Sequence, residues 1–391
     1  MRTRVIDKPR TQAGQCGDSG LPSSLSTGTD PAPVGYRLPA VADVRWRADF
    51  RSAVLDEVAE FIAVRATELD GAGLGVAGDM VAEFVSGGKC VRSTFMYLGW
   101  LCGAAPSESE LRAAASLELL HGFALIQDDV MDDSAERRGL PAVHVQLAQW
   151  HRDRRLPGSA RRFGESGATL LGDLCMIWAE QMLRESGVDQ RGLQRAWPRY
   201  DAMRTELAIG QFADLMNDAR RMPTLETVLD VARRKSGNYT VRRPLEIGAA
   251  MAGCDERLVA QLGRYGGAVG EAFQLRDDVL GVFGTPAETG KPNGGDLLER
   301  KASSVVVAAC ELADAPTARE ITTLMNTETL DDAAIDRWRT LIVSSGALGR
   351  IEDMIERRLT SALQDLADMP IGDPVRAALA DLAAACGERT T

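Results

Sequence analysis

Apolar residues recur at helical spacing along most of the chain after residue 42. Within residues 42–69 the apolar positions recur at mixed spacings of three and four, which predicts a helix with one core face: Phe50, Val54, Val58, Phe61, Ile62 and Val64. Similar patterns predict helices over residues 108–129, 168–185, 197–218, 224–253 and 270–284, and amphipathic helices after residue 303. Runs of β-branched residues are few, so the pattern favours an all-α protein.

Two segments lack this periodicity. Residues 1–42 combine Gly, Ser, Thr and Pro with too few apolar positions to offset the entropy lost on ordering. We interpret residues 1–42 as a disordered N-terminal arm and residues 43–391 as the folded domain. Residues 151–163 are basic and contain Pro157 and Gly158, so we expect an exposed loop there.

A cluster of carboxylates follows the apolar run FALI within LHGFALIQDDVMDDSAERRG, residues 120–139. At roughly 100° per residue, Asp128 and Asp132 lie about 40° apart on a helix, with Asp129 beside them. Carboxylates at this density suit Mg²⁺, which keeps several waters and is completed by substrate phosphates. Arg137 and Arg138 follow within reach of such a phosphate. An exposed charged helix end is the alternative, and the preceding apolar run argues against it.

Two further signals suggest anion binding near this site. Lys89 and Arg92 begin a helix after a Gly-Gly turn, where free backbone N–H groups favour an anionic ligand. Two surface cations would give the same pattern. His121 lies two turns before Asp128 on almost the same face, so it is either a ligand contact or an ordinary core histidine.

A second acidic pair, Asp277 and Asp278, lies on a later helix, with Gln274 one turn before it. The position that corresponds to Asp132 is Gly281, so this site offers two adjacent carboxylates where the first offers three. We expect the substitution Gly281→Asp to be tolerated.

Lysines occur at two places between and after the acidic helices. Around residues 235–237 the helical pattern is interrupted, which would direct Lys235 inward, although an ordinary loop fits the same pattern. Residues 285–303 are rich in Gly and Pro and contain Lys291 and Lys301, a composition typical of a lid that closes on phosphate. By contrast, residues 331–336 lack an apolar run or an arginine pair, so we interpret their aspartates as a helix cap and an exposed face.

Composition narrows the classes of function. A net charge of −11 and a pI near 5.0 argue against a nucleic-acid partner. The seven cysteines have no zinc-like spacing and are interpreted as reduced. No apolar run reaches the roughly 18 residues of a membrane span, so we expect a cytoplasmic protein without a membrane anchor.

No nucleophile triad or nucleotide fingerprint accompanies the carboxylates, so the chemistry should depend on metal and electrostatics, as in the departure of diphosphate from an allylic carbon.

The motifs GGKCVRS, ELLHGFALIQDDVMD, RRG, RKSGNYT, FQLRDDVLG, GKPNGGD and ERK occur in this order. Over about residues 43–391 the sequence therefore resembles the trans-prenyl diphosphate synthases. The resemblance implies an all-helical bundle of the isoprenoid synthase type around a central apolar cavity, normally a homodimer, with Mg²⁺ as cofactor. The implied substrates are isopentenyl diphosphate and the allylic dimethylallyl, geranyl and farnesyl diphosphates.

The resemblance also implies a role for each motif residue. The isopentenyl diphosphate site would comprise Lys89, Arg92, His121 and Arg138. The allylic diphosphate and its magnesium cluster would be held by Arg137, Lys235, Ser236, Gln274, Lys291 and Lys301. The metal ligands would be Asp128, Asp132 and Asp277, with Asp129 and Asp278 beside them. The catalytic group would be Asp128, Asp132, Lys235 and Asp277.

Four positions depart from the family pattern: Cys90 stands where many members have Arg, Ser93 replaces a common Pro, Ser236 replaces a common Thr, and Gly281 replaces the last Asp of the second motif. We interpret the replacement at Ser93 as a difference in the backbone, and Ser236 keeps the hydroxyl of the Thr it replaces. We expect the metal at the second motif to be bound by Asp277 and water.

The expected product is geranylgeranyl diphosphate (C20). On an ideal helix, Ala124 lies one turn before Asp128 and leaves room for a growing chain. Phe123, five residues before the first Asp, matches a place where the family often has an aromatic pocket floor. A farnesyl diphosphate synthase (C15) and a class I terpene cyclase are the alternatives. Lys89, Arg92 and His121 argue against a cyclase, which needs no second diphosphate site. A non-catalytic regulatory subunit is disfavoured by the two acidic motifs.

Overall fold

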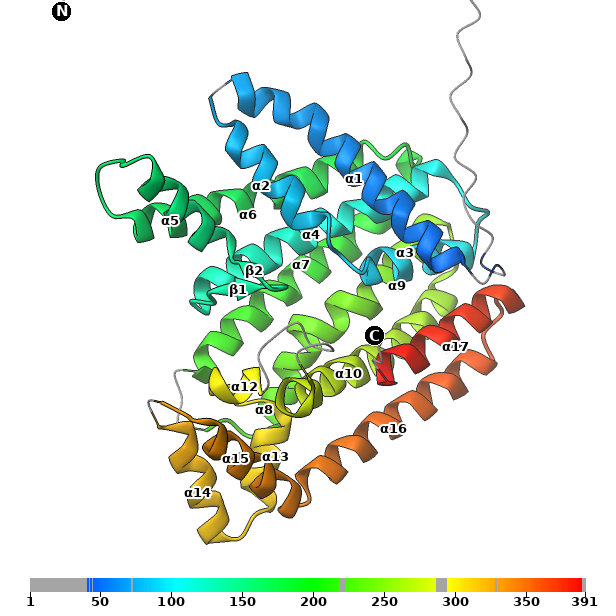
Figure 1. The fold of residues 1–391 in the computed structure, drawn as a ribbon. Coiled ribbons are helices and arrows are strands. Elements are labelled where there is room, and N and C mark those ends of the chain that lie inside the picture. The colour runs from blue at the N-terminus through cyan, green and yellow to red at the C-terminus, as the bar shows by residue number, and fades with distance from the viewer. Residues whose placement is uncertain are drawn as a thin grey trace, which may run out of the picture. The chain divides into compact units, whose positions relative to one another are not determined.

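Helices account for almost all regular structure in the computed structural model, which describes residues 41, 43, 45–71, 73–218, 222–285, 294–327 and 329–388 (Figure 1). Within these residues, the only strands are β1 (Glu136–Arg137) and β2 (Leu140–Pro141), which pair antiparallel. The expected all-α class is confirmed. The interpretation of residues 1–42 as a disordered arm falls almost entirely outside the described residues, so it stays a prediction.

The first half of the fold precedes the second acidic motif. Its helices are α1 (Trp46–Gly71), α2 (Gly75–Val85), α3 (Val91–Leu101), α4 (Glu108–Met131), α5 (Val143–Asp153), α6 (Ala160–Arg184), α7 (Gln190–Asp218), α8 (Leu225–Ala232), the π-helix η1 (Arg233–Arg242) and α9 (Arg243–Met251). Helix α4 packs against α1, α3 and α6, and α3 packs against α9. These contacts bury most of the apolar positions that the sequence pattern predicts; Val64 of α1 is an exception, because it is exposed.

The second half is arranged around one long helix. Its helices are α10 (Glu256–Phe283), α12 (Gly295–Leu298), α13 (Ser304–Leu312), α14 (Ala315–Met325), α15 (Asp332–Ser344), α16 (Ala347–Ala367) and α17 (Asp373–Glu388). Helix α10 contributes to two apolar cores: Tyr265 and Val269 belong to the larger core, which also contains residues of α1, α3 and α4, whereas Leu275 and Val282 belong to the smaller core, which also contains residues of α13 and α15. Figure 1 shows α16 and α17 running beside α10.

Polar side chains cap the first turn of several helices. Ser107 accepts a hydrogen bond from the backbone N–H of Glu110 at the start of α4, and Asp255 does the same for Leu258 at the start of α10. Asp331 caps α15, so its interpretation as a helix cap rather than a metal site agrees with the structure.

Several boundaries differ from the predictions. The exposed loop expected over residues 151–163 is shorter, because α5 continues to Asp153, where His151 is buried, and α6 begins at Ala160. Helix α7 starts at Gln190 and accommodates Pro198 in its interior. The interruption expected at residues 235–237 is not a break, because α8 continues directly through η1 into α9.

Close backbone contacts surround η1. A Cβ atom on Gly237 would lie 2.9 Å from the carbonyl carbon of Gly270 in α10, and a Cβ on Gly270 would overlap the carbonyl of Gly237. On the other side, a Cβ on Gly210 of α7 would lie 2.6 Å from the backbone nitrogen of Lys235. Glycine is therefore needed at these three positions for η1 to lie directly on its neighbours.

Two other expectations from the sequence concern membrane-spanning helices and disulfide bonds. No helix in the described part of the chain is long and apolar enough to cross a membrane. The six cysteines within it form no disulfide bonds.

Candidate active site

Lys235 connects the first acidic motif to α7. Its Nζ donates hydrogen bonds to Oδ1 of Asp128 at 2.9 Å and to Oδ2 of Asp214 at 2.6 Å. Gln211, one turn before Asp214, donates to Oδ1 of Asp128 at 3.0 Å. The small contact surface of Gly210 allows η1 to approach α7, which brings the lysine between the two carboxylates. The expectation that Lys235 is directed inward therefore agrees with the structure.

The ionic partners of Asp128 determine its protonation. Burial acts to raise the pKa of this carboxyl, but Lys235, Arg137 and Lys301 outweigh burial, and the pKa lies below its usual value. The same contacts raise the pKa of Lys235 despite its burial. Asp128 is therefore ionised and Lys235 protonated at neutral pH.

Asp132 follows the last turn of α4 and faces the other lysine of the site. Nζ of Lys301 lies 3.7 Å from Oδ2 of Asp132 and 3.1 Å from Glu299. Burial and the neighbouring carboxylate of Asp128 raise the pKa of Asp132. An added cation beside Asp128 and Asp132 would relieve this repulsion.

Asp129 and Asp278 have different surroundings from the other aspartates. Asp129 is buried and accepts hydrogen bonds from Nε and Nη2 of Arg137. Asp278 is buried as well, and it accepts from Ser304 at 2.6 Å and from Gln274 at 2.8 Å. Burial raises the pKa of Asp278 to about 6. Both carboxylates are thus engaged with neighbouring side chains, and their role as metal ligands stays a prediction.

The structure describes some, but not all, of the remaining residues predicted for the allylic side. Asp277 of α10 and Ser236 of η1 are both half-buried. Lys291 lies outside the described residues.

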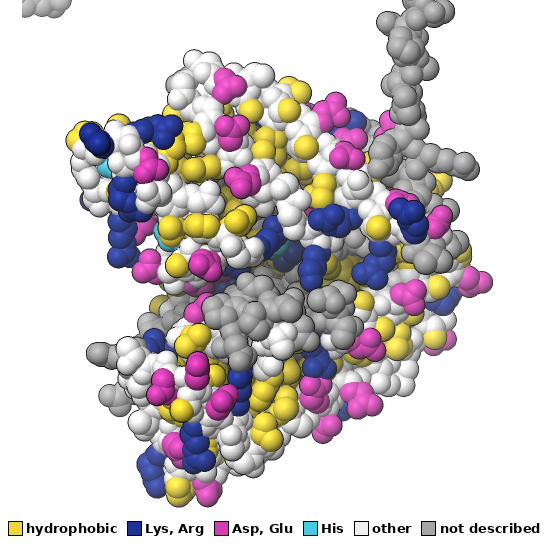
Figure 2. Space-filling view, viewed as in Figure 1, with side chains coloured by type: hydrophobic (Ala, Val, Ile, Leu, Met, Phe, Trp, Pro, Cys, Tyr) yellow, Lys and Arg dark blue, Asp and Glu magenta, His cyan; other side chains and the backbone are white. Residues whose placement is uncertain are grey.

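A second group of cations surrounds His121. Arg92 stacks on the ring of Tyr239, with 4.4 Å from Cζ to the ring centroid, and donates to Oγ1 of Thr240 at 2.9 Å. Arg138 donates to the carbonyl of Phe84 at 3.3 Å. In Figure 2, Lys and Arg side chains gather along a hollow that crosses this face of the protein.

His121 is neutral in this environment. Burial and the charges of Arg92, Arg138 and Arg137 lower its pKa well below the usual value. Its Nδ1 is buried and has no hydrogen-bond partner among the described residues. A ring in this state can offer one N–H to an anionic ligand without adding charge.

Glu118 lies buried among these cations. It accepts a hydrogen bond from Oγ of Ser93 at 2.7 Å, and burial raises its pKa although Ser93, Arg92 and Arg138 oppose the rise. The hydroxyl of Ser93 therefore satisfies a buried carboxyl group, a role in addition to the backbone difference interpreted from the sequence.

Cys90 supplies no charge at the position where many family members have Arg. It is buried in a left-handed conformation, with φ 51°, and burial raises the pKa of its thiol. Arg51 of α1 lies nearby and donates from Nε to the carbonyl of Gly88 at 2.8 Å. A cation from α1 thus supports the loop that Cys90 follows.

Sequence reasoning assigned no role to several residues of the two groups, namely Arg51, Glu118, Gln211, Asp214, Tyr239 and Thr240. A charged residue in the apolar run ASLELL and the Gln-Asp pair on α7 were the available signals. Neither signal indicates a partner until the helices are placed together.

The structure changes the expectation for Gly281. An added Cβ at this position would overlap the carboxylate of Asp296 in α12. Asp296 also contributes to the raised pKa values of Asp278 and Lys301, so its carboxylate belongs to the site. The carboxylate of Asp296 in α12 therefore occupies the space beside Gly281.

We expect Gly281→Ala to destabilise the protein by about 1–3 kcal/mol, because Asp296 must move, and to lower turnover as well. Gly281→Asp should be at least as harmful. Gly267→Ala on the same helix is the matched control, since its Cβ would meet only Cδ of Arg242 at 3.9 Å. Chemical denaturation and steady-state turnover measure both effects. Equal stability of the 281 and 267 variants would contradict the overlap.

The carboxylates fit a magnesium ion by their chemistry. Asp128, Asp132 and Asp214 offer hard oxygen atoms, and Lys235 and Lys301 already place positive charge against them. No group of three or more His, Cys, Asp or Glu side chains forms a closed metal site in the part of the chain that the structure describes. Mg²⁺ does not require one, because it binds through one or two carboxylates and completes its shell with water and phosphate.

Comparisons with known proteins agree with this geometry. Residues 76–342 match the family model described as polyprenyl synthetase. A geranylgeranyl diphosphate synthase from Mycobacterium tuberculosis is 31% identical over 72% of this chain and 76% of the relative. A (2E,6E)-farnesyl diphosphate synthase from the same organism is 30% identical over 76% and 78%.

A solved structure is also similar. It is a geranylgeranyl pyrophosphate synthase from Corynebacterium glutamicum, complexed with isoprenyl diphosphate and magnesium. It superposes with a TM-score of 0.84 and 35% identity, covering 88% of this chain and 99% of that one.

Proposed function

Since the chain belongs to the polyprenyl synthetase family and is a trans-prenyl chain-elongating transferase, we propose that it forms geranylgeranyl diphosphate. It would do so by adding isopentenyl diphosphate to allylic dimethylallyl, geranyl and farnesyl diphosphates. The observation that supports chain elongation rather than cyclisation is the presence of two separate cationic groups, one at Asp128 and one at His121. Chain elongation binds two diphosphates, whereas a terpene cyclase binds one.

On the allylic side, Lys235, Lys301 and Arg137 would bind the diphosphate, joined by Ser236 and Lys291. Asp128, Asp132 and Asp277 would hold Mg²⁺, which supplies positive charge to the leaving diphosphate when bound. Asp129 would orient Arg137, since it accepts two hydrogen bonds from that guanidinium. Asp278 would orient Gln274 and the start of α13 in the same way.

On the other side, Lys89, Arg92 and Arg138 would bind the diphosphate of isopentenyl diphosphate, with a hydrogen bond from neutral His121. The C1–O bond of the allylic substrate breaks, and the double bond of isopentenyl diphosphate forms a new bond to C1. The departing diphosphate then takes the proton that leaves the condensed product. The side chains of this protein orient both diphosphates and supply charge rather than a nucleophile.

Incubation of the purified protein with Mg²⁺, isopentenyl diphosphate and each allylic primer tests the reaction directly. We expect His121→Ala to raise the KM for isopentenyl diphosphate by about tenfold and to change the KM for the primer little, because one charge-assisted hydrogen bond is lost on one side. His151→Ala, which removes a buried histidine of α5, is the control. Equal effects on both KM values would contradict the division into two sites, and turnover without isopentenyl diphosphate would indicate a cyclase.

Product length depends on what lies below Asp128 on α4. Phe123 and Ala124 are half-buried and pack against the larger apolar core. We propose that the ring of Phe123 limits the product to C20, with C15 as the alternative.

Phe123→Ala should shift the products beyond C20, because removing the ring lengthens the space available to the chain. Chromatography of the dephosphorylated alcohols measures the shift. Phe61→Ala is a matched control, since Phe61 is also half-buried but lies on α1. An unchanged profile would place the stop at Leu120 or on a neighbouring helix.

We also propose a homodimer. Phe163, Leu170 and Ile177 lie seven residues apart on α6 and are exposed, and Ile209 and Phe212 of α7 are exposed as well. Apolar rows of this kind are typical of a surface that another subunit covers. Sedimentation should give twice the chain mass of 42.1 kDa, and Ile177→Lys should reduce it to that of one chain.

A further inference from the structure

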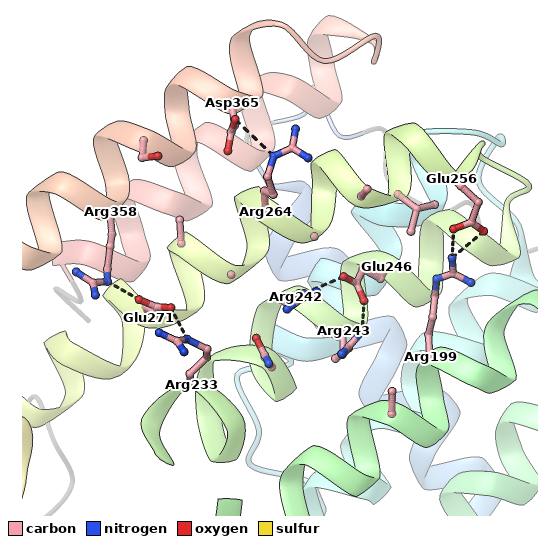
Figure 3. Close-up of a pocket in the computed structure, with 18 of the residues that line it drawn as sticks. Arg199, Arg233, Arg242, Arg243, Glu246, Glu256, Arg264, Glu271, Arg358 and Asp365 are labelled. Carbon is pink, nitrogen blue, oxygen red and sulfur yellow. Dashed lines mark hydrogen bonds and ion pairs between the residues drawn. The ribbon is translucent and has the colours of Figure 1, made fainter. Parts of the chain in front are cut away.

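A large groove lies on the side of η1 that faces away from Arg92. Asn238 and Arg242 of η1 line it, whereas the intervening Tyr239 and Thr240 contact Arg92. Residues of α7, α9, α10 and α16 complete the walls, and the volume is about 1020 Å³ (Figure 3). The groove is therefore separated from the candidate active site by the π-helix.

The groove is basic although the chain is acidic. Seven arginines and four acidic residues line it, in a protein with a net charge of −11. An excess of guanidinium groups in one concave surface raises the local concentration of anions.

The arginines that form ion pairs retain hydrogen-bond donors. Arg233 and Arg358 both donate to Glu271 through Nε, at 2.7 and 2.6 Å, and Arg242 donates to Glu246 through Nε at 2.9 Å (Figure 3). These three contacts do not use the terminal nitrogens of the guanidinium groups, although Nη1 of Arg233 lies 3.6 Å from Asp230 and Nη1 of Arg358 contacts a backbone carbonyl at 3.3 Å. One carboxylate between two arginines cannot satisfy their ten N–H groups.

Two more arginines are held loosely. Arg264 lies 4.0 Å from Asp365 and makes no hydrogen bond, and Arg357 has no hydrogen-bond or ionic partner within the described ranges. They extend from α10 and α16, on opposite walls of the contact between these helices.

The floor offers space and apolar surface. Gly267 has no neighbour closer than Cδ of Arg242 to its missing Cβ, at 3.9 Å, and Val259, Ala260 and Ala268 line the same side. A ligand can therefore approach the backbone of α10 between the arginines.

We propose that this groove is a second binding site for a diphosphate group, either as the free anion or as the head of an isoprenoid. Guanidinium forks bind phosphate oxygens in pairs, and a diphosphate has enough oxygens to engage several forks at once. The proposal rests on the proposed function only for the choice of isoprenoid probe.

Titration calorimetry of the full chain with inorganic diphosphate, in EDTA and without Mg²⁺, tests the site. Ser361 of α16 lines the groove and is exposed, so Ser361→Glu places a negative charge there, whereas Thr360→Glu places it on the neighbouring exposed position outside the lining. We expect Ser361→Glu, and Arg264→Ala combined with Arg357→Ala, to raise Kd by about tenfold or more. We expect Thr360→Glu and the remote Arg337→Ala to leave it unchanged.

Lys235→Met serves as the location control, because it alters the active site and not the groove. If Lys235→Met abolishes all diphosphate binding, or if Ser361→Glu and Thr360→Glu bind as the unmodified protein does, the proposal is overturned. Titration with geranyl diphosphate identifies the source of the ligand. Tighter binding than inorganic diphosphate, weakened by Ser361→Glu, indicates the isoprenoid, and equal or weaker binding indicates the free anion.

Discussion

Replacement of Asp128 by Asn is expected to lower kcat by at least about 10³-fold while the helical fold is retained. The carboxylate accepts hydrogen bonds from Lys235 and Gln211 and lies 3.6 Å from Arg137, so it is the centre of the ionic contacts on the allylic side. Asn keeps the shape and removes the charge that would hold the cation beside the leaving diphosphate.

Asp133→Asn is the matched control for this variant. Asp133 lies just beyond α4, is exposed, and forms an ion pair with Arg161 at 3.4 Å and with no other residue of the described chain. Steady-state turnover with a labelled primer and circular dichroism together separate loss of chemistry from loss of fold. Near-normal turnover of a folded Asp128→Asn protein would refute the assignment of the site.

Lys235→Met should lower kcat by about 10²-fold, because Lys235 is the only residue of the described chain that donates to both Asp128 and Asp214. It should also change the pH profile. The lysine holds the pKa of Asp128 below its usual value against the effect of burial. Without it that pKa rises, the carboxylate becomes protonated at a higher pH, and the acidic limb of the kcat profile should move upward in pH.

Arg234→Met removes one positive charge from the adjacent residue of η1 and is the control. Arg234 pairs with Asp230 at 2.9 Å and makes no contact with Asp128. An acidic limb that moves equally in both variants would show that general charge, rather than the contact with Asp128, sets the profile.

Local patterns were sufficient to predict the helices and the residues of the first acidic motif. Helical periodicity places apolar faces, and a heptad separates His121 from Asp128, so both follow from positions along one helix. The structure brings Lys235 to Asp128 although 107 positions separate them, and the sequence signal for this was only an irregularity at residues 235–237.

The remaining features depend on contacts between helices. Asp296 occupies the space beside Gly281, and Ser93 satisfies Glu118, but neither pairing follows from spacing in the sequence. The π-helical form of η1 was also not predicted, because an interrupted periodicity is equally consistent with a loop. These features were set by packing rather than by local propensity.

The contact between Gly237 and Gly270 limits how this enzyme can diverge. Each position excludes a side chain because of the other's backbone, so no substitution at one can compensate for a substitution at the other. A large and a small core residue can exchange places through two successive substitutions. These two glycines cannot, because a side chain on either one would overlap the backbone of the other. Random mutagenesis aimed at new product lengths should therefore return substitutions at positions 123 and 124 of α4 and leave both glycines unchanged, so that every variant keeps the contact between the π-helix and α10.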